Sequence, residues 1–279
     1  MKSVSPSDAV VGLWLPCRTL IQREIVRFLR QRSRIIGALG TPLIFWLMVG
    51  GGLGRSFSLG ASGGVTEGAA SMTYMQYTFP GALAAILLFT SIFAMISIID
   101  DRREGFMQGV LVAPVPRLAI VLGKVMGASI LAIGQAAVFL LLAPTAGVPL
   151  SIESFLLTAA AMIPVAIAVT ALGFWLAWIM DSTQGFHGIM NLLLMPMLVL
   201  SGAFFPPSGS AAVLRWITLV NPMTYSVALL RHAVFPGGSE AVGHVIDLWA
   251  ALGVTVAFAL LMIGISIFVA IRDSARAAQ

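Results

Sequence analysis

Six stretches of about twenty mostly apolar residues divide the chain, and they limit the possible folds more than any other feature of the sequence. A helix needs about twenty such residues to cross the hydrocarbon core of a bilayer. The stretches cover residues 35–54, 79–99, 118–142, 154–180, 186–205 and 247–271. The hydrophobic fraction of 59% exceeds the value that is usual for soluble domains, and the charged fraction of 10% falls below it. The sequence therefore predicts an all-α integral membrane protein with six transmembrane helices.

The basic residues predict the orientation of these helices. Thirteen of the sixteen fall on the side that holds both termini and the loop between the second and third stretches, and Arg55, Arg215 and Arg231 fall on the other. Lys and Arg concentrate on the cytoplasmic side of membrane proteins. We therefore expect a cytoplasmic N-terminal arm over 1–34, a transmembrane region over 35–271 and a cytoplasmic tail over 272–279. The short apolar stretch after Lys2 is not expected to be cleaved as a signal peptide.

The sequence offers no catalytic or metal-binding pattern. It holds no P-loop, no dinucleotide-binding glycine pattern and no H-E-x-x-H, and it has one cysteine and three unclustered histidines. We therefore expect no catalytic residue, no metal, no bound cofactor and no nucleic-acid partner. Lys124, Asp181 and Asp247 stand near the ends of predicted spans, where we expect their side chains to reach the aqueous boundary.

The N-terminal arm predicts a basic amphipathic helix. Over residues 18–34, apolar side chains recur at helical spacing, and Arg23, Arg27, Arg30 and Arg34 fall on another face. Such a helix suits the inner headgroup layer of a membrane. Two interpretations remain open, a membrane-surface anchor and a contact with a soluble partner.

The loop over 100–117 contains more than the charges that topology requires. Asp101 and Glu104 have the spacing of a capping box at a helix N-terminus, apolar residues follow at helical spacing, and Pro114 is expected to end the helix. The pattern predicts a short cytoplasmic docking helix for another protein. Its candidate residues are Asp100, Asp101, Arg102, Arg103, Glu104, Phe106, Met107, Val110, Leu111 and Pro114.

Between the fifth and sixth stretches, residues 206–246 hold two apolar halves that are separated by Asn221-Pro222 and too short to span. They predict an external re-entrant helix pair, with two amphipathic surface helices as the alternative. Gln135 and Asn191 are polar residues within predicted spans, and either interhelical hydrogen bonds or contacts with a transported substrate explain them. Pro164 and Pro196 are expected to kink their helices.

Two stretches give the sequence a resemblance to a family. "EGFMQGVLVAPVPRLAIVLGK" (104–124) resembles the loop of ABC type-2 exporter permeases, including drug-resistance-type and polysaccharide-type exporters. "LSGAFFPPSGSAAVLRWITLVNPMTYSVALLRHAVF" (200–235) resembles the SG-x-x-FP and NP-x-T-Y stretch of the same family, with Tyr225 and Arg231 in its pattern. Phe106, Gln108 and Ala113 depart from residues that are common in the first pattern.

The resemblance implies a specific assembly. Two permease copies, identical or different, would pair, and each would bind one cytoplasmic ATPase subunit that holds ATP and magnesium. Residues 100–117 would couple ATP hydrolysis to transport, and the arginines of the N-terminal helix would lie at the same interface. The permease would lie in the bacterial inner membrane, where it would contact membrane lipids. Its cargo would be a lipophilic drug, a lipid or a lipid-linked glycan. An ATP-independent channel or carrier, and a scaffold without transport, are the alternatives.

Overall fold

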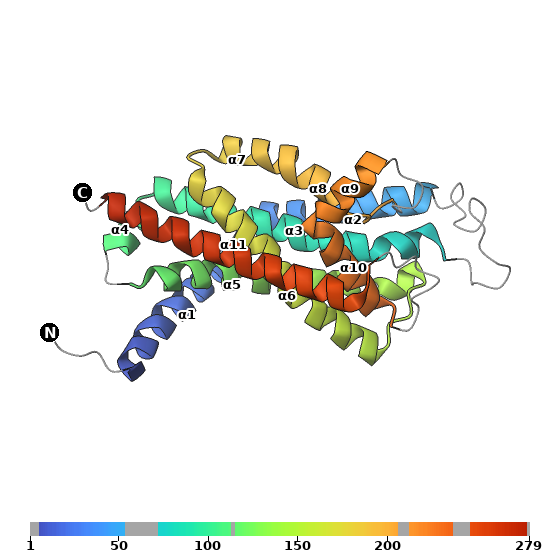
Figure 1. The fold of residues 1–279 in the computed structure, drawn as a ribbon, viewed down its shortest axis with the longest axis horizontal. Helices are drawn as coiled ribbons and strands as arrows, with labels where there is room; N and C mark the ends of the chain where they lie inside the picture. Colours follow the sequence, from blue (N-terminus) through green and yellow to red (C-terminus); the bar gives the residue numbers. More distant parts are fainter. Residues whose placement is uncertain (1–5, 54–71, 113–114, 206–211, 237–245, 278–279) are drawn as a thin grey trace.

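The computed structural model describes residues 6–53, 72–112, 115–205, 212–236 and 246–277, and the described residues form helices and connecting turns without strands. The helices run in an elongated bundle (Figure 1). Their bounds are α1 Pro6–Arg30, α2 Arg32–Leu53, α3 Tyr74–Arg103, α4 Phe106–Val112, α5 Arg117–Leu140, α6 Ile152–Ile179, α7 Thr183–Ile189, α8 Met195–Val199, α9 Ala212–Val220, α10 Pro222–Val234 and α11 Leu248–Ala277. A short 3₁₀ turn covers Ala143–Ala146, and a π-helical turn covers Met190–Leu194.

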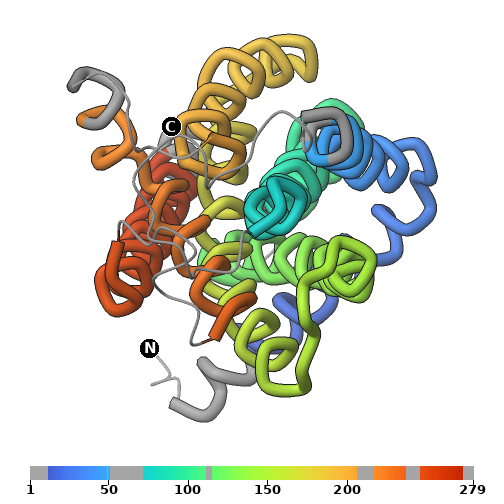
Figure 2. The backbone as a smooth tube through the Cα atoms, turned by 90° about the vertical axis from the view of Figure 1, so that its right-hand side faces the viewer, coloured from blue at the N-terminus to red at the C-terminus, as the bar shows by residue number. Residues whose placement is uncertain are grey.

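Helix α3 is the centre of the bundle. It packs against α2, α5, α6 and α10, and 94% of its most apolar stretch is buried, against 28% for α11. Figure 2 shows the other helices around it in a view along the bundle. Because residues 79–99 are apolar apart from Thr90, Ser91 and Ser97, α3 can be covered on every side, which is the pattern of a buried helix.

Four described helices are long and apolar enough to cross a membrane. They are Tyr74–Arg103, Arg117–Leu140, Ile152–Ile179 and Leu248–Arg272. The other two predicted spans fall on α2 and on the helical segment from α7 to α8. That segment changes to a π-helical turn just before Pro196, because proline lacks the N–H that the α-helical ladder needs. By contrast, α6 continues as one α-helix through Pro164.

The two ends of the bundle carry different elements. Helices α1 and α4 lie at one end together with the last turns of α3 and α11, and we call this the α4 end (Figure 1). Helices α9 and α10 lie toward the other end, near the first turn of α3, and we call this the α9 end. Because the chain reverses direction between consecutive long helices, residues that are distant in the sequence lie at the same end of the bundle.

Candidate functional site

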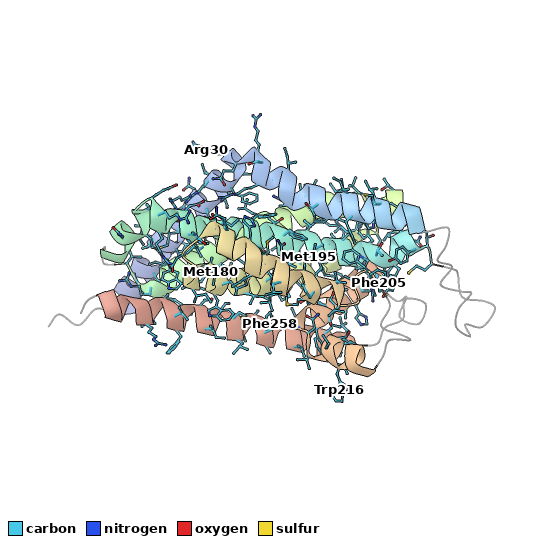
Figure 3. The ribbon with its side chains drawn as sticks, turned by 90° about the horizontal axis from the view of Figure 1, so that it is seen from above. Arg30, Met180, Met195, Phe205, Trp216 and Phe258 are labelled. Carbon is cyan, nitrogen blue, oxygen red and sulfur yellow. The ribbon has the colours of Figure 1, made fainter. Side chains whose placement is uncertain are left out.

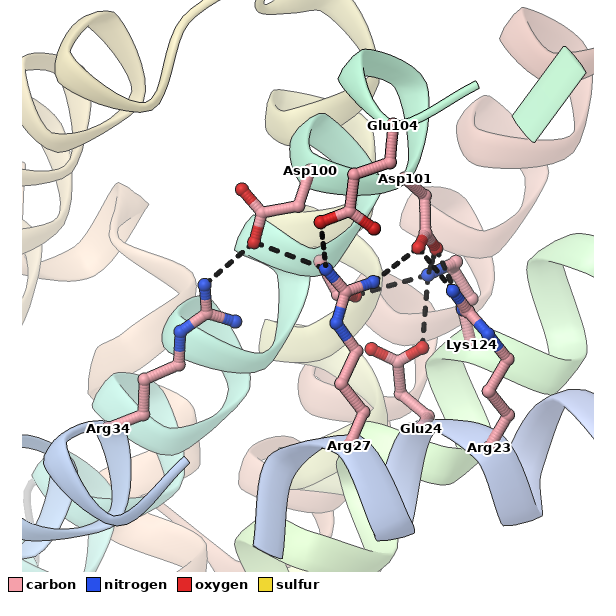
Figure 4. Close-up of polar contacts among 9 residues, drawn as sticks. Arg23, Glu24, Arg27, Arg34, Asp100, Asp101, Glu104 and Lys124 are labelled. Carbon is pink, nitrogen blue, oxygen red and sulfur yellow. Dashed lines mark hydrogen bonds and ion pairs between the residues drawn. The ribbon is translucent and has the colours of Figure 1, made fainter. Parts of the chain in front are cut away.

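Eight charged side chains gather at the α4 end, four acidic and four basic. They come from α1, α2, the last turn of α3 and its exit, and α5 (Figure 4). We call them the charge cluster, which comprises Arg23, Glu24, Arg27, Arg34, Asp100, Asp101, Glu104 and Lys124.

Asp101 is the centre of the charge cluster and is fully buried. Its Oδ2 accepts from Lys124 Nζ at 2.7 Å, and its Oδ1 accepts from Arg23 Nη2 at 2.6 Å and from Arg27. Lys124 Nζ also donates to Glu24 Oε2 at 3.0 Å and to Ser97 Oγ at 3.1 Å. A buried charge is tolerable only with such partners, because its desolvation is costly.

This arrangement corrects two predictions. Lys124 does not reach the aqueous boundary, since its side chain is 1% exposed and is held by two carboxylates. Asp101 does not cap a following helix, and Glu104 is not its reciprocal partner, because α3 continues as helix to Arg103 and contains Asp101. The two aspartates thus stand at the C-terminal end of a helix dipole, where negative charge is unfavourable. The surrounding guanidinium and ammonium groups offset both that effect and the burial.

The outer part of the charge cluster is partly exposed. Asp100 Oδ2 accepts from Arg34 Nη2 at 2.8 Å and from Arg27 Nη2 at 3.4 Å, and Arg27 lies 3.7 Å from Glu104 Oε1. Arg34 belongs to α2 rather than to the N-terminal helix, since α1 ends at Arg30. Arg30 is exposed and points away from the bundle (Figure 3). Three of the four predicted interface arginines therefore bind the chain's own aspartates.

Hydrogen bonds to Asp101 raise the pKa of Arg23 above its ordinary value, so its guanidinium keeps its charge. The same side chain lies over the Phe106 ring, with Cζ 3.6 Å from the ring centroid. Such a cation–π contact adds attraction between α1 and α4. Arg23 thus joins the N-terminal helix both to the end of α3 and to the short helix after it.

The connection from α3 to α4 is a tight turn. Gly105 has φ +77°, which a residue with a side chain rarely adopts, and its N–H donates to Arg102 O at 3.3 Å. On α4, Met107 is 2% exposed and packs into the bundle, while Gln108 and Gly109 are exposed. The helix therefore has an anchored face and an outward face.

The remaining predicted residues of this loop have separate positions. Val110 is half-buried on α4. Arg102 donates to Trp178 O at 2.7 Å and to Met180 O at 3.3 Å, and Arg103 donates to Asp181 O at 3.3 Å, so both tie α3 to the end of α6 and the turn after it. Pro114 and the side chain of Leu111 lie outside the described residues.

A second polar group lies at the α9 end and holds the segment 201–205 against the first turn of α3. Arg231 on α10 is buried, its Nη2 donates to Gly202 O at 3.0 Å, and its Cζ lies 4.4 Å from the Tyr77 ring centroid. Tyr77 also donates to Gly202 O at 3.2 Å, and Tyr74 donates to Phe204 O at 2.6 Å. Three side chains from two helices thus bind the backbone of one turn.

The other candidate residues of the 206–246 segment organise the α9–α10 corner. Asn221 caps α10 by accepting from Met223 N at 3.0 Å, and its amide donates to Met197 O at 2.6 Å. Pro222 occupies the first position of α10, where its missing N–H is harmless, and Tyr225 donates to Leu219 O at 2.9 Å. Residues 206–211 and 237–245 of the predicted 206–246 segment lie outside the described residues.

Gln135 and Asn191 do not lie in one environment. Gln135 Oε1 accepts from Thr90 Oγ1 at 2.8 Å, a hydrogen bond between α5 and α3. Asn191 is exposed on the π-helical turn. The structure brings neither of them to the charge cluster.

Sequence reasoning missed two members of the charge cluster and the tyrosines of the α9 end. Glu24 stands among arginines and Lys124 within an apolar run, separated from each other by 100 positions, so no local spacing connects them. Two features of the sequence could have indicated this pair: an acidic residue on a basic helix, and a lysine inside a predicted span. Among the described residues, no group of His, Cys, Asp and Glu has the arrangement of a metal site.

Comparison with known proteins agrees with the resemblance found in the two sequence stretches. The family model described as "ABC-2 type transporter" matches residues 16–235. The chain is 24% identical over 214 residues to ycf38 of Cyanophora paradoxa, which is named as a transport permease, covering 76% of this chain and 71% of that protein. It is 28% identical over 219 residues to nodulation protein J of Sinorhizobium fredii, covering 75% and 78%. It is also 28% identical to the inner membrane transport permease YhhJ of Escherichia coli, but that match covers 57% of this chain and 44% of YhhJ.

Proposed function

The chain belongs to the ABC-2 type transporter family, and from this premise we propose that it is the membrane-spanning permease subunit of an ATP-driven exporter. The single observation that carries the proposal beyond family membership is α4, a short helix with a buried anchor at Met107 and an exposed outer face. A helix held this way transmits a force applied from outside to the helix that precedes it. Its neighbour α3 is the most buried helix of the bundle.

The proposed position is the bacterial inner membrane, with the α4 end in the cytoplasm. The excess of basic residues around this end supports that orientation, and the relative named as an inner membrane permease supports the compartment. Helix α2 and the segment from α7 to α8 would complete six spans. The described part of α2 and that segment are both apolar along most of their length.

A separate cytoplasmic ATPase subunit would dock on the outward face of α4, around Phe106, Gln108 and Gly109. ATP and magnesium would bind to that subunit, and two permease copies would pair with two ATPase copies. Motion received by α4 would pass to α3 through the turn at Gly105. It would pass to α1 through the Arg23–Phe106 contact and the charge cluster. The ion pairs would couple α1 to the end of α3, since buried ion pairs are costly to separate, and the Arg23–Phe106 contact would add α4 to the same unit.

At the α9 end, α9 and α10 would form a re-entrant pair beside the exit. Nine residues of α9 reach only about 14 Å at 1.5 Å per residue, too short to span. The side chains that hold 201–205 would keep the exit closed at rest. The cargo class would be lipophilic, a drug, a lipid or a lipid-linked glycan, in keeping with apolar residues such as Trp216 and Val220 exposed around this end.

The test is co-purification of the full chain with the ATPase subunit encoded beside it, followed by ATPase measurement in nanodiscs. Replacing Gln108 by Lys puts bulk and charge on the outward face of α4, and we expect it to lower stimulation of the ATPase by about tenfold, the loss of roughly one hot-spot contact. Gln184→Lys is the matched control, since Gln184 is also exposed at the α4 end, on α7. Equal stimulation by both variants would refute docking on α4, and transport without any ATPase would refute the exporter assignment.

A further inference from the structure

The helical segment from α7 to α8 lies along the outside of the bundle (Figures 1 and 2). Helix α7 packs against α3, and α8 packs against α10. The side chains that the segment buries recur at a spacing of four residues and are Phe186, Met190, Leu194 and Leu198. The chain leaves the other side of the segment open. We call this side the outer face, which comprises the exposed residues Gly188, Asn191, Leu192 and Met195.

Asn191 puts an amide in the middle of the outer face. Its side chain is exposed and makes no hydrogen bond with any residue that the structure describes. Four residues earlier, the ring centroid of His187 lies 6.1 Å from that of Phe93 on α3. Because α3 and this segment run in opposite directions along the bundle, Asn191 lies near the level of Phe89, the midpoint of the apolar run 79–99. An unpaired amide at that depth is costly, because hydrocarbon offers no hydrogen-bonding partner.

Helix α11 shows how this chain builds a face that suits lipid. The exposed side chains near the middle of α11 are apolar, among them Leu260 at 65% and Leu261 at 57%. The outer face is similarly apolar at Leu192, which is 80% exposed, but it also holds the amide of Asn191. Polar side chains within membrane helices hydrogen-bond across helix–helix contacts. The outer face therefore has the composition of a surface that meets another helix.

A second copy of this chain supplies the partner that the amide needs. An asparagine amide both donates and accepts, so two of them satisfy each other. Two copies in one bilayer hold Asn191 at the same depth, and a two-fold axis places a residue of one copy against the same residue of the other. Gly188 stands three residues before Asn191, and a Cβ atom there would meet nothing within 4 Å. A glycine at this position lets a second backbone come close, as small residues do at contacts between membrane helices.

We propose that the outer face is the contact surface between two identical copies of the chain, with the two Asn191 amides hydrogen-bonded to each other across the two-fold axis. The proposal rests on the proposed function for the position of this segment in the membrane. It adds to that function the surface through which the copies pair and the identity of the two copies.

The first experiment measures self-association without the ATPase. The full chain, labelled at its C-terminus with a donor or an acceptor fluorophore, is reconstituted in phosphatidylcholine liposomes, and energy transfer is followed as the protein is diluted with lipid. We expect Asn191→Leu to weaken self-association by about tenfold. Gln135→Leu is the matched control, since that amide is already bonded to Thr90 within the chain, and it should stay within about twofold of the unchanged chain.

Bulk on the outer face gives an independent comparison. Gly188→Leu and Gly264→Leu both add a side chain where a Cβ atom would meet nothing within 4 Å, the first on the outer face and the second on an exposed position of α11. Gly188→Leu should weaken self-association by about tenfold or more, and Gly264→Leu should leave it within about twofold. Equal effects of the two glycine variants, or of Asn191→Leu and Gln135→Leu, would overturn the proposal. The exporter assignment would still stand in that case, because the copies could pair through another face.

Cross-linking identifies the partner. In a Cys17→Ser background, which removes the single native cysteine, Asn191→Cys is oxidised in membranes with copper phenanthroline. We expect a disulfide-linked product with twice the mass of the chain, and no such product from Leu260→Cys on α11. A product of another mass, which would mean that a different membrane protein covers the outer face, would overturn the proposal. So would equal cross-linking at the two positions or the lack of any product.

Discussion

Lys124 Nζ on α5 lies 2.7 Å from Asp101 Oδ2 on α3, and both side chains are almost completely buried. Glu24 on α1 completes the set at 3.0 Å from the same ammonium group. Three helices thus meet at one buried cation. Removal of Lys124 leaves Glu24 buried without this cation, whereas Asp101 keeps its bonds to Arg23 and Arg27. A buried charge that loses its ion-pair partner is costly.

The first prediction follows from this geometry. Lys124→Met should destabilise the folded chain by about 3–5 kcal/mol, because Glu24 would remain buried without this cation and Asp101 would lose one of its three cationic partners. The measurement is the apparent unfolding temperature in detergent, with the exposed Arg30→Gln as the control. Adding Glu24→Gln to Lys124→Met should recover part of the loss, as a double-mutant cycle would show. Additive losses would mean that the pair does not interact.

A second prediction concerns the close approach of α3 to the turn at 201–205. A Cβ atom at Gly81 would stand 2.3 Å from Ala203 O, a backbone atom that cannot move aside alone. Gly81→Ala should therefore displace this turn and lower the unfolding temperature. At Gly134 on α5 a Cβ atom would meet nothing within 4 Å, so Gly134→Ala should be neutral or stabilising by up to about 1 kcal/mol. Equal unfolding temperatures of the two variants would contradict the close packing of Gly81 against Ala203.

The third prediction tests whether Arg231, rather than Tyr225 on the same helix, holds the turn at 201–205. Arg231→Met removes the bond to Gly202 O and the cation–π contact with Tyr77, and should raise amide hydrogen exchange across 201–205. Tyr225→Phe removes an exposed hydroxyl bond to Leu219 O and should leave that exchange unchanged. Exchange that stays equal in the two variants would show that Arg231 does not hold the turn.

A fourth prediction addresses Gln135. Its hydrogen bond with Thr90 explains its place within an apolar helix, and such bonds in membrane proteins contribute about 0.6 kcal/mol on average. Gln135→Leu should therefore lower stability slightly, and Thr90→Val added to it should cost little more. Transport activity should persist in both variants. Loss of transport with unchanged stability would instead indicate contact with the cargo.

The sequence by itself determined the class of fold and the place of its helices. Twenty-residue apolar runs require helices in lipid, where every backbone polar group must bond within its own segment. The strongest runs, 79–99, 118–142, 154–180 and 247–271, correspond to α3, α5, α6 and the apolar part of α11. The two motif stretches identified the family, because they depend on residue order alone.

Tertiary structure alone decided which charges meet. The sequence predicted Asp101 as a helix cap because Glu104 stands three residues later, but α3 continued through it and turned its carboxylate toward α1 and α5. The partners Glu24, Asp101 and Lys124 come from three helices, and their meeting depends on how each helix is rotated in the bundle. Local spacing carries no information on that rotation, whereas the cost of burying an unpaired charge fixes it once the helices pack.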